Sequence, residues 1–331
     1  MTDDAWAGHG FLTVSDDALA ALGIGTDAVV EAIEAAIRAA ADGALRSPPK
    51  AATTAPGGRY YMTTLGTADA PGVTVVKSVM VSPRNPARGL GGVEGVILVQ
   101  DSETGLVQAV LGAGWITAVR TAGLSAVAAK RLARPDAQCV AFVGCGVQAR
   151  SHLDALAALF PLEEIRAVGR GAVNVDRLCA RARSLGLAAR AATPRDALED
   201  ADIVVTSIPL DHDTPAFLDA GWLKPGAFAA ITDLGIPWHD ASMPAFGTVI
   251  VDDRAQEAAA PVKLVEPALV TGDLAGLVTG NCPARYDPQK AAAFVFRGMA
   301  VGDYAAAALA FARAQRAGIG TKVSMPPATG L

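Results

Sequence analysis

The sequence predicts an α/β protein that combines a doubly wound parallel sheet with a second, α+β domain. Strand-like and helix-like patterns alternate from about residue 139 to residue 251, as expected where helices cross over between parallel strands. Four strand-like runs joined by short turns come before them, which is typical of an antiparallel sheet. At 331 residues the chain exceeds what one hydrophobic core usually serves, so two domains are expected.

The first domain should begin with an amphipathic helix. Over residues 26–42 the apolar side chains fall on one helical face, with Thr26 or Asp27 as the N-cap and Gly43 as the stop. Runs rich in Val, Ile, Tyr and Thr then predict the antiparallel strands, at 59–65, 72–81, 93–100 and 106–111.

A helix over 115–133, stopped by Pro135, should lead into the second domain. Its strands are expected at 139–143, 165–168, 187–191, 203–207, 227–232 and 249–251, and its helices at 150–160, 173–184 and around Asp196. The last helix, 303–317 with Gly318 as its cap, can return to the first domain. We therefore expect a first domain of 1–118 with 305–331 and a second domain of 119–304.

The run CVAFVGCGVQA, residues 139–149, reads as a strand, a glycine turn and the start of a helix. Gly144 permits the tight turn, Gly146 lets the backbone approach a phosphate, and Ala149 lets helix and strand pack closely. The free N–H groups of the helix start, at Val147 and Gln148, then face the anion. This combination predicts a Rossmann site for a nicotinamide or flavin dinucleotide, although glycines alone also end buried strands for structural reasons.

Charge and composition restrict the partners. The net charge of −5 gives no basic field, which argues against nucleic acid or an anionic membrane as the main partner and favours a small-molecule ligand. Charges, Pro or Gly interrupt every apolar stretch before the ~18 residues that a membrane span needs. The acidic start at 1–4 lacks the basic-then-apolar order of a signal peptide, so we expect a cytoplasmic protein.

Neither cysteines nor histidines show the spacing of a metal site. The cysteines at 139, 145, 179 and 282 lack a CxxC pair and are expected to be reduced, and the histidines at 9, 152, 212 and 239 are scattered. Cys145 is either a thiol activated by the helix N-terminus or a small residue that fills a tight loop.

Lys77 is the most informative charged residue, because it shares one strand face with Val73, Val75 and Val79. A buried lysine needs an anionic partner or gives up its proton. The alternative is a lysine at a sheet edge that extends to water.

Three further residues are candidates. Arg120, among small residues of helix 115–133 and near the domain boundary, can clamp a carboxylate or form an interdomain salt bridge. Arg46 is expected to be a solvated loop charge. Asp233 follows the strand 227–232 at the carboxyl edge of the sheet, where it is an acid/base candidate or an aspartate of a turn or N-cap.

Several motifs together resemble the ornithine cyclodeaminase/μ-crystallin family over nearly the whole chain. The matching segments are 92–101 with Thr104, Gly105 and Ala109, then 117–122, 144–149, Gly272-Asp273-Leu274, Gly280, Arg285, Phe294, Gly298 and Asp303. The resemblance implies an N-terminal substrate and dimerisation domain, completed by the C-terminal helix, and a Rossmann domain between. It also implies that Arg46, Lys77 and Arg120 hold a substrate α-carboxylate and that Asp233 lies at or beside the catalytic aspartate.

The shared reaction of that family is hydride transfer between a nicotinamide and the carbon of an α-imine or α-amine. We expect a homodimeric NAD(P)H-dependent reductase of a small α-imino acid, with Lys77 or Asp233 managing the proton and Thr121, Thr206, Ser207 and Asp233 beside the cofactor. The alternatives are an ornithine cyclodeaminase, an alanine-dehydrogenase-like enzyme, or a binding protein with vestigial catalysis. Cyclodeaminases carry their aspartate in a Gly-Gly-Asp-Cys-Pro-Gly-like stretch, which differs from Thr232-Asp233-Leu234-Gly235 here.

The choice between NADP(H) and NAD(H) depends on the end of the second nucleotide-domain strand. In an NAD site an acid there binds the ribose hydroxyls, but Glu163 and Glu164 precede the strand. Its carboxyl end reads Val168-Gly169-Arg170-Gly171, and Arg170 can pair with a 2′-phosphate. We therefore favour NADP(H) over NAD(H), the alternative being an exposed Arg170 that tolerates either.

Overall fold

The computed structural model describes residues 10–211 and 213–324, and the chain divides into two compact units. The first unit holds the described residues up to Arg120 together with those from Ala300 onward, and the second runs from Thr121 to Met299. The acidic start at 1–4 and the histidines at positions 9 and 212 lie outside the described residues.

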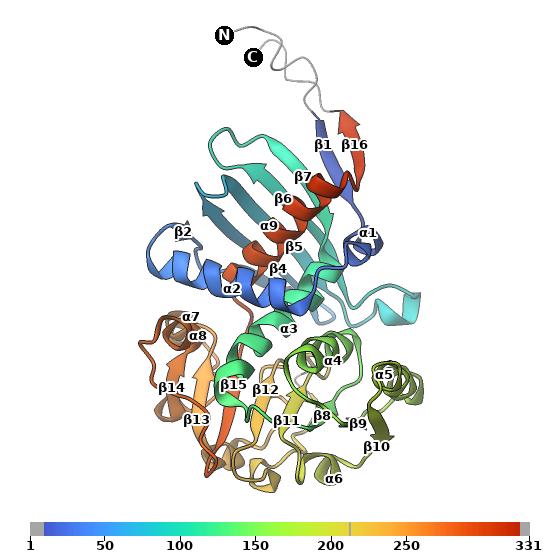
Figure 1. Ribbon diagram of the computed structural model, residues 1–331, viewed down its shortest axis with the longest axis vertical. Coiled ribbons are helices and arrows are strands. Elements are labelled where there is room, and N and C mark those ends of the chain that lie inside the picture. Colours follow the sequence, from blue (N-terminus) through green and yellow to red (C-terminus); the bar gives the residue numbers. More distant parts are fainter. Residues whose placement is uncertain (1–9, 212, 325–331) are drawn as a thin grey trace, which may run out of the picture. The chain divides into compact units, whose positions relative to one another are not determined.

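The first unit is built on an eight-stranded sheet in the order β16-β1-β7-β6-β5-β4-β2, with β3 paired to β4 (Figure 1). Its strands are β1 Gly10–Val14, β2 Leu45–Arg46, β3 Ala51–Ala55, β4 Arg59–Ala68, β5 Val73–Val81, β6 Val93–Asp101, β7 Val107–Gly112 and β16 Thr321–Ser324. The four strands predicted from the sequence are confirmed and are antiparallel to one another. β1 and β16 were not expected; they join the edge of the sheet through pairings between distant parts of the chain.

Three helices complete the first unit, with the N-terminal part of a fourth. They are α1 Asp16–Ala21, α2 Thr26–Ala41 and α9 Ala300–Ala317, besides the 3-10 turn Pro86–Arg88. α9 contacts strands β4 to β7 and also contacts α2. The expected N-cap of α2 was wrong: Gly25 is the N-cap and Thr26 is already helical, because the extended backbone that precedes a helix lies one residue earlier. α9 starts three residues before the predicted 303.

The second unit is a Rossmann-type sheet of eight strands, all parallel, in the order β10-β9-β8-β11-β12-β15-β13-β14. The strands are β8 Cys139–Val143, β9 Glu164–Val168, β10 Ala188–Ala191, β11 Ile203–Thr206, β12 Phe228–Ile231, β13 Phe246–Val251, β14 Val270–Asp273 and β15 Ala291–Val295. The strand order reverses between β8 and β11, which is the switch point where such sheets bind ligands. Every residue of β8, β11, β12 and β15 is buried, as expected for strands covered on both faces.

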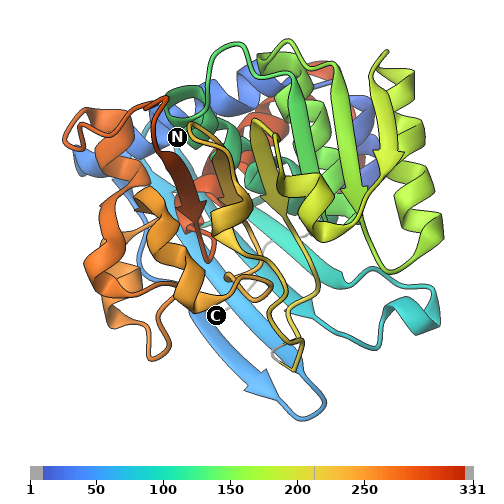
Figure 2. The same cartoon turned by 90° about the horizontal axis from the view of Figure 1, so that it is seen from below.

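Helices cover this sheet: α5 contacts β9 and β10, α4 contacts β11, and α6 contacts β8 and β9 (Figure 2). The helices are α3 Ala113–Leu132, which continues from the first unit, α4 Val147–Leu159, α5 Ala172–Ser184, α6 Pro194–Leu198, α7 Arg254–Ala259 and α8 Leu274–Thr279, with 3-10 turns at Ala220–Trp222, Asp240–Ala245 and Pro267–Leu269. No helix of the described chain is long and apolar enough to cross a membrane.

Candidate functional site

A buried ion cluster in the first unit joins three distant parts of the sequence. Lys77 Nζ of β5 donates a hydrogen bond to Asp303 Oδ1 of α9 at 2.7 Å. Arg120 Nε of α3 lies 3.0 Å from the same oxygen. Asp303 Oδ2 accepts a hydrogen bond from Thr64 Oγ1 of β4 at 3.0 Å. The structure therefore brings together the two predicted cations and adds an anion between them.

The alternation of β5 explains why Lys77 is buried. Val73, Val75 and Val79 share its face, and that face is buried while the intervening residues are more exposed. α9 contacts β5, and Asp303 lies in its first turn. Lys77 is only 1% exposed, so the reading of a lysine that extends to water is wrong and the anionic partner that burial requires is present.

Burial and charge act against each other on this cluster. Burial lowers the pKa of Lys77 to about 8, although the neighbouring Asp303 raises it, and Arg120 lowers it further. Burial alone would raise the pKa of Asp303, but the charges of Lys77 and Arg120 outweigh it and hold that pKa below its ordinary value. At neutral pH the cluster therefore contains an ionised carboxylate and an ammonium group that can release its proton near neutrality.

Arg46 differs from its prediction. It belongs to the two-residue strand β2 and pairs with Thr67 of β4, so the expectation of a loop charge was wrong, although the side chain is exposed. The loop pattern of Ser47-Pro48-Pro49 hid this short pairing, which depends on a strand some twenty residues later. Among the described interactions, Arg46 makes no hydrogen bond or ion pair with Lys77, Arg120 or Asp303.

The glycine turn of the second unit has the geometry of an anion cradle. Gly144 has a φ of +92°, and a Cβ placed there would lie 2.5 Å from the carbonyl oxygen of Ser207, so no other residue fits. Gly146 is the N-cap of α4 and supplies no side-chain cap, and the space beside it is open. Ala149 is completely buried, which lets α4 pack closely.

The start of α4 leaves polar groups for a ligand. Val147, the first residue of the helix, is 58% exposed, and the first N–H groups of a helix have no partner within it. The side-chain oxygen Oε1 of Gln148 is buried and has no hydrogen-bond partner among the described residues. A helix N-terminus without a cap, next to an unpartnered amide, fits the pyrophosphate of a dinucleotide.

Asp233 ties two strand ends together beside this turn. Its Oδ1 accepts a hydrogen bond from Thr206 Oγ1 at 2.9 Å, and its Oδ2 accepts one from the backbone N–H of Ile208 at 3.1 Å. The residue is fully buried, and burial raises its pKa to about 6 against these hydrogen bonds. Both carboxylate oxygens are thus engaged in fixing the segment that follows β11, which includes Ser207.

Arg170 lies on the surface at the end of β9. Gly169, Arg170 and Gly171 are exposed, and the exposed stretch 169–174 contains no carboxylate. A Cβ on Gly169 would lie 2.9 Å from Val175 and 3.2 Å from Cys145 Sγ, so this turn runs tightly over α5. Burial raises the pKa of the Cys145 thiol to about 11, which supports its reading as a small residue that fills a loop.

Other predicted residues have plainer surroundings. Thr121, the first residue of the second unit, is buried in α3. No group of three or more His, Cys, Asp or Glu side chains is placed to hold a metal ion in residues 10–211 and 213–324.

Sequence reasoning missed the contact roles of Asp303 and Thr64. Asp303 had a signal, because it is the only acid in the alanine-rich helix α9.

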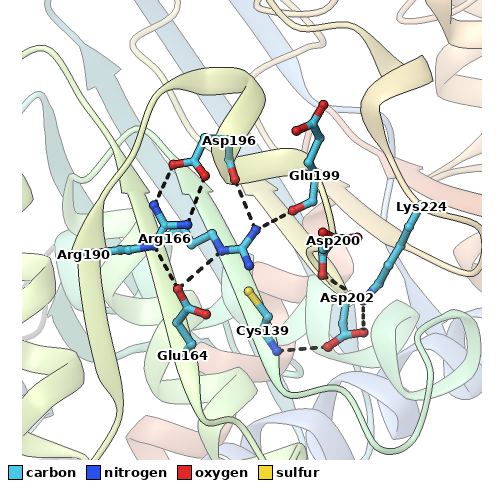
Figure 3. A network of polar contacts seen from close by, with 9 residues as sticks. All are labelled: Cys139, Glu164, Arg166, Arg190, Asp196, Glu199, Asp200, Asp202 and Lys224. Carbon is cyan, nitrogen blue, oxygen red and sulfur yellow. Dashed lines mark hydrogen bonds and ion pairs between the residues drawn. The ribbon is translucent and has the colours of Figure 1, made fainter.

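A second polar network lies at the opposite, amino-terminal edge of the parallel sheet (Figure 3). Arg190 binds both Asp196 and Glu164, and Lys224 pairs with Asp202 at 2.7 Å. Asp202 also accepts the backbone N–H groups at the start of β8. Because Arg166, Arg190 and Lys224 are each paired with a carboxylate, this network stabilises the strand starts.

Known proteins resemble this chain over most of its length. The ornithine cyclodeaminase/mu-crystallin family model matches residues 21–318. A candidate dehydrogenase of Rhizobium meliloti is 35% identical over 310 residues, which are 88% of this chain and 92% of that protein. The ketimine reductase mu-crystallin of Mus musculus is 28% identical over 219 residues, 65% of this chain and 68% of its own.

Among solved structures, Δ1-pyrroline-2-carboxylate reductase of Thermococcus litoralis, in complex with NADH and L-proline, has a TM-score of 0.83. It is 23% identical, and the match covers 95% of this chain and 100% of that one. At this identity the likeness shows a shared fold.

Proposed function

Because the chain belongs to the ornithine cyclodeaminase/mu-crystallin family, we propose that it reduces a small α-imino acid to the amino acid with NAD(P)H. The imino acid is of the ketimine, pyrroline-2-carboxylate or iminosuccinate type. The observation that carries the proposal is the buried cluster of Lys77, Arg120 and Asp303, which offers cations to a carboxylate and a proton near neutral pH. Relatives that bear the names of a dehydrogenase and a ketimine reductase support the oxidoreductase class.

In this proposal Arg120, Lys77 and Arg46 bind the α-carboxylate of the substrate. When bound, the nicotinamide supplies the hydride that reaches the imine carbon. Lys77 supplies the proton for the nitrogen: it gives one N–H to Asp303 and retains two others. Asp233 has both carboxylate oxygens occupied, so we assign it to shaping the cofactor site rather than to proton transfer.

The cofactor would lie along the carboxyl edge of the Rossmann sheet. Backbone N–H groups of Val147 and Gln148 would hold the pyrophosphate. Gly144 and Gly146 leave space for it to approach these groups, and the small side chain of Ala149 lets α4 pack closely on the sheet. Thr206, Ser207 and Thr121 would border the remainder, and Asp233 holds Thr206 and Ile208 in place.

We propose that NADP(H) is preferred, because Arg170 is exposed in a stretch without carboxylates. Dissociation constants for NADPH and NADH, measured by fluorescence in wild type and Arg170→Ala, test this. We expect tighter binding of NADPH in the wild type and a loss of that preference in the variant. Equal wild-type affinities, or unchanged NADPH binding in Arg170→Ala, would contradict it.

The decisive assay follows the absorbance of NADPH and NADH on addition of a panel of imino acids. We expect consumption of cofactor by the wild type. Lys77→Ala and Arg120→Ala should each lose at least ~1.5–3 kcal/mol in kcat/KM, the range of a charge-assisted hydrogen bond, while cofactor affinity is kept. Wild-type kinetics in a folded variant would exclude that residue from the site, and no oxidation with any imino acid would favour a binding protein.

Ornithine distinguishes the second candidate, a cyclodeaminase. The segment after Asp233 lacks the Cys-Pro-Gly of that activity, so we expect proline to form slowly or not at all. Rapid release of proline and ammonia from ornithine with catalytic NAD would replace our proposal. Net reduction of NAD by alanine would instead indicate an alanine-dehydrogenase-like enzyme.

A further inference from the structure

Asp303 is a carboxylate of the protein itself, placed where two cations meet. Its Oδ1 lies 2.7 Å from Lys77 Nζ and 3.0 Å from Arg120 Nε, and its Oδ2 is fixed by Thr64. The residue is 3% exposed, so these charges interact with little screening by water. Two cations and one anion leave the cluster with a single net positive charge.

We propose that Asp303 is a positioning residue that keeps Lys77 protonated before substrate arrives and so matches the cluster to a substrate with one carboxylate. The inference rests on the proposed function, within which it narrows the substrate to monocarboxylate imino acids. A dicarboxylate would bring a second negative charge, and the buried cluster has no further cation for it, since Arg46 is exposed and Lys50 only half-buried, so that water screens both. An unpaired charge away from water is costly.

The surroundings of Lys77 identify Asp303 as the group that holds the proton. Among the described residues, the charged groups that act on Lys77 are Asp303 of α9, Arg120 of α3 and Lys50 of the segment before β3, and Asp303 is the one anion of the three. Thr64 of β4 contributes an uncharged hydroxyl. Without Asp303, burial and two like charges would favour the neutral amine. A substrate carboxylate would then have to restore the missing negative charge.

Replacement of the Asp303 charge by a bound carboxylate can be measured without turnover, by counting the protons that the protein takes up when the carboxylate binds. Calorimetry with pyrrole-2-carboxylate at pH 7, in two buffers with different ionisation enthalpies, gives that number. The wild type should take up about a tenth of a proton or less, because Lys77 is already charged. Asp303→Asn should take up close to one proton, since the bound anion recharges Lys77.

Two further variants identify the titrating group. Lys77→Met combined with Asp303→Asn should abolish the uptake, because the amine is gone. Thr64→Val removes only the hydrogen bond to Asp303 Oδ2 and leaves every charge in place, so its proton count should equal that of the wild type. Absence of uptake in Asp303→Asn, or an uptake in Thr64→Val as large as the one expected for Asp303→Asn, would overturn the inference.

The charge of the ligand is tested on the wild type itself. Pyrrole-2-carboxylate should bind at least tenfold more tightly than succinate, and a preference for succinate, or binding of neither, would overturn the inference even if Asp303→Asn did not fold. In a folded Asp303→Asn this ratio should fall at least tenfold, and the alkaline limb of kcat/KM should move to lower pH by about one unit or more.

The reductase assay separates this inference from the proposed function. Reduction of imino acids together with an unchanged proton count in Asp303→Asn would refute the role of Asp303 and leave the reductase standing. A proton count that changes as expected, without reduction of any imino acid, would refute the reductase and support the charge balance of the cluster.

Discussion

Two fully buried side chains of the second unit should respond to pH in opposite directions. His152 of α4 lies 2.8 Å through Nδ1 from the carbonyl oxygen of Gln148 and 2.9 Å through Nε2 from Ser125 Oγ. A carbonyl only accepts, so we assign the proton to Nδ1, and the serine donates to Nε2. Burial lowers the pKa of His152 from 6.5 to about 4.

The pH dependence of the free energy of unfolding is set by the difference in proton binding between the folded and unfolded chains. Below pH 6.5 the unfolded chain protonates His152 and the folded chain does not, so this contribution to stability is lost as the pH falls towards 4. Burial raises the pKa of Asp233 from 3.8 to about 6, so the folded chain holds the extra proton there. The contribution of Asp233 to stability therefore falls as the pH rises from about 4 to 6.

We predict that the two effects largely cancel in the wild type and that single variants separate them. Relative to wild type, the free energy of unfolding of His152→Gln should fall with rising pH between about pH 4.5 and pH 6, by roughly 1.4 kcal/mol per unit, and that of Asp233→Asn should rise. Urea unfolding of all three proteins at several pH values measures this. Parallel curves for wild type and either variant would contradict the assigned pKa shift.

At the scale of helices and strands, local pattern was informative where the apolar period is clear. The strand with Lys77 and the turn at Gly144 were predicted from local sequence, because alternation and glycine geometry are local properties. β15 was missed although it lies between β12 and β13, since its sequence AAAFV has weak strand propensity and burial on both faces decides its structure.

The candidate site was only partly predictable, because its contacts join segments that are distant in sequence. Burial of Lys77 predicted an anionic partner, but that partner, Asp303, is 226 residues away in sequence. Nothing local links α9 to β5, and only packing brings Asp303 to the amine. Asp233 was located by its place after a strand, while the engagement of both its oxygens depends on β11.

Helix α3, which carries Arg120, depends on a cap from a distant residue. Asp16 Oδ1 accepts the N–H of Trp115 in the first turn of α3 at 2.7 Å, across 99 positions in sequence. A Cβ on Gly112 or Gly114 would lie 2.6 or 2.7 Å from the same carboxylate, so these glycines make room for it. The position of Arg120 therefore depends on the first residue of α1, which no pattern within α3 predicts.

We predict that Asp16→Ala lowers the free energy of unfolding by about 0.5–2 kcal/mol, the usual cost of losing a helix cap. The exposed Asp17, next to it in α1, is the matched control, and Asp17→Ala should have little effect. Urea or thermal unfolding of both variants makes the comparison. If the two variants were equally stable, Asp16 would not act as the cap of α3.

At the scale of the whole molecule, the sheet of the first unit has two unlike faces. α9 contacts β4 to β7, where Lys77 and its valine neighbours are buried. Alternation directs the intervening residues to the other face, and there a cross-strand row of apolar side chains forms. The register pairs Leu65 with Val76, Val76 with Leu98, and Leu98 with Val110.

This row is only partly covered, since Leu65 is 37% exposed and the other three are of intermediate burial. Burying apolar surface is favourable by about 25 cal/mol per Å², and a flat sheet face can pair with a second copy of itself about a twofold axis. We therefore propose that this face is the contact of a homodimer.

We predict that Leu98→Asp, at the centre of the row, weakens the dimer at least tenfold, because the new carboxylate loses water at the contact. Thr54→Asp is the control, since Thr54 is an exposed residue of β3 that pairs with Tyr60, lies on the opposite face of the sheet and should leave the dimer intact. Sedimentation equilibrium over a range of concentrations measures the dissociation constants. A monomeric wild type, or a dimer equally strong in Leu98→Asp, would show that the two copies meet elsewhere or not at all. Retained NADPH binding by the monomeric variant would show that the Rossmann unit folds and holds its ligand without the contact.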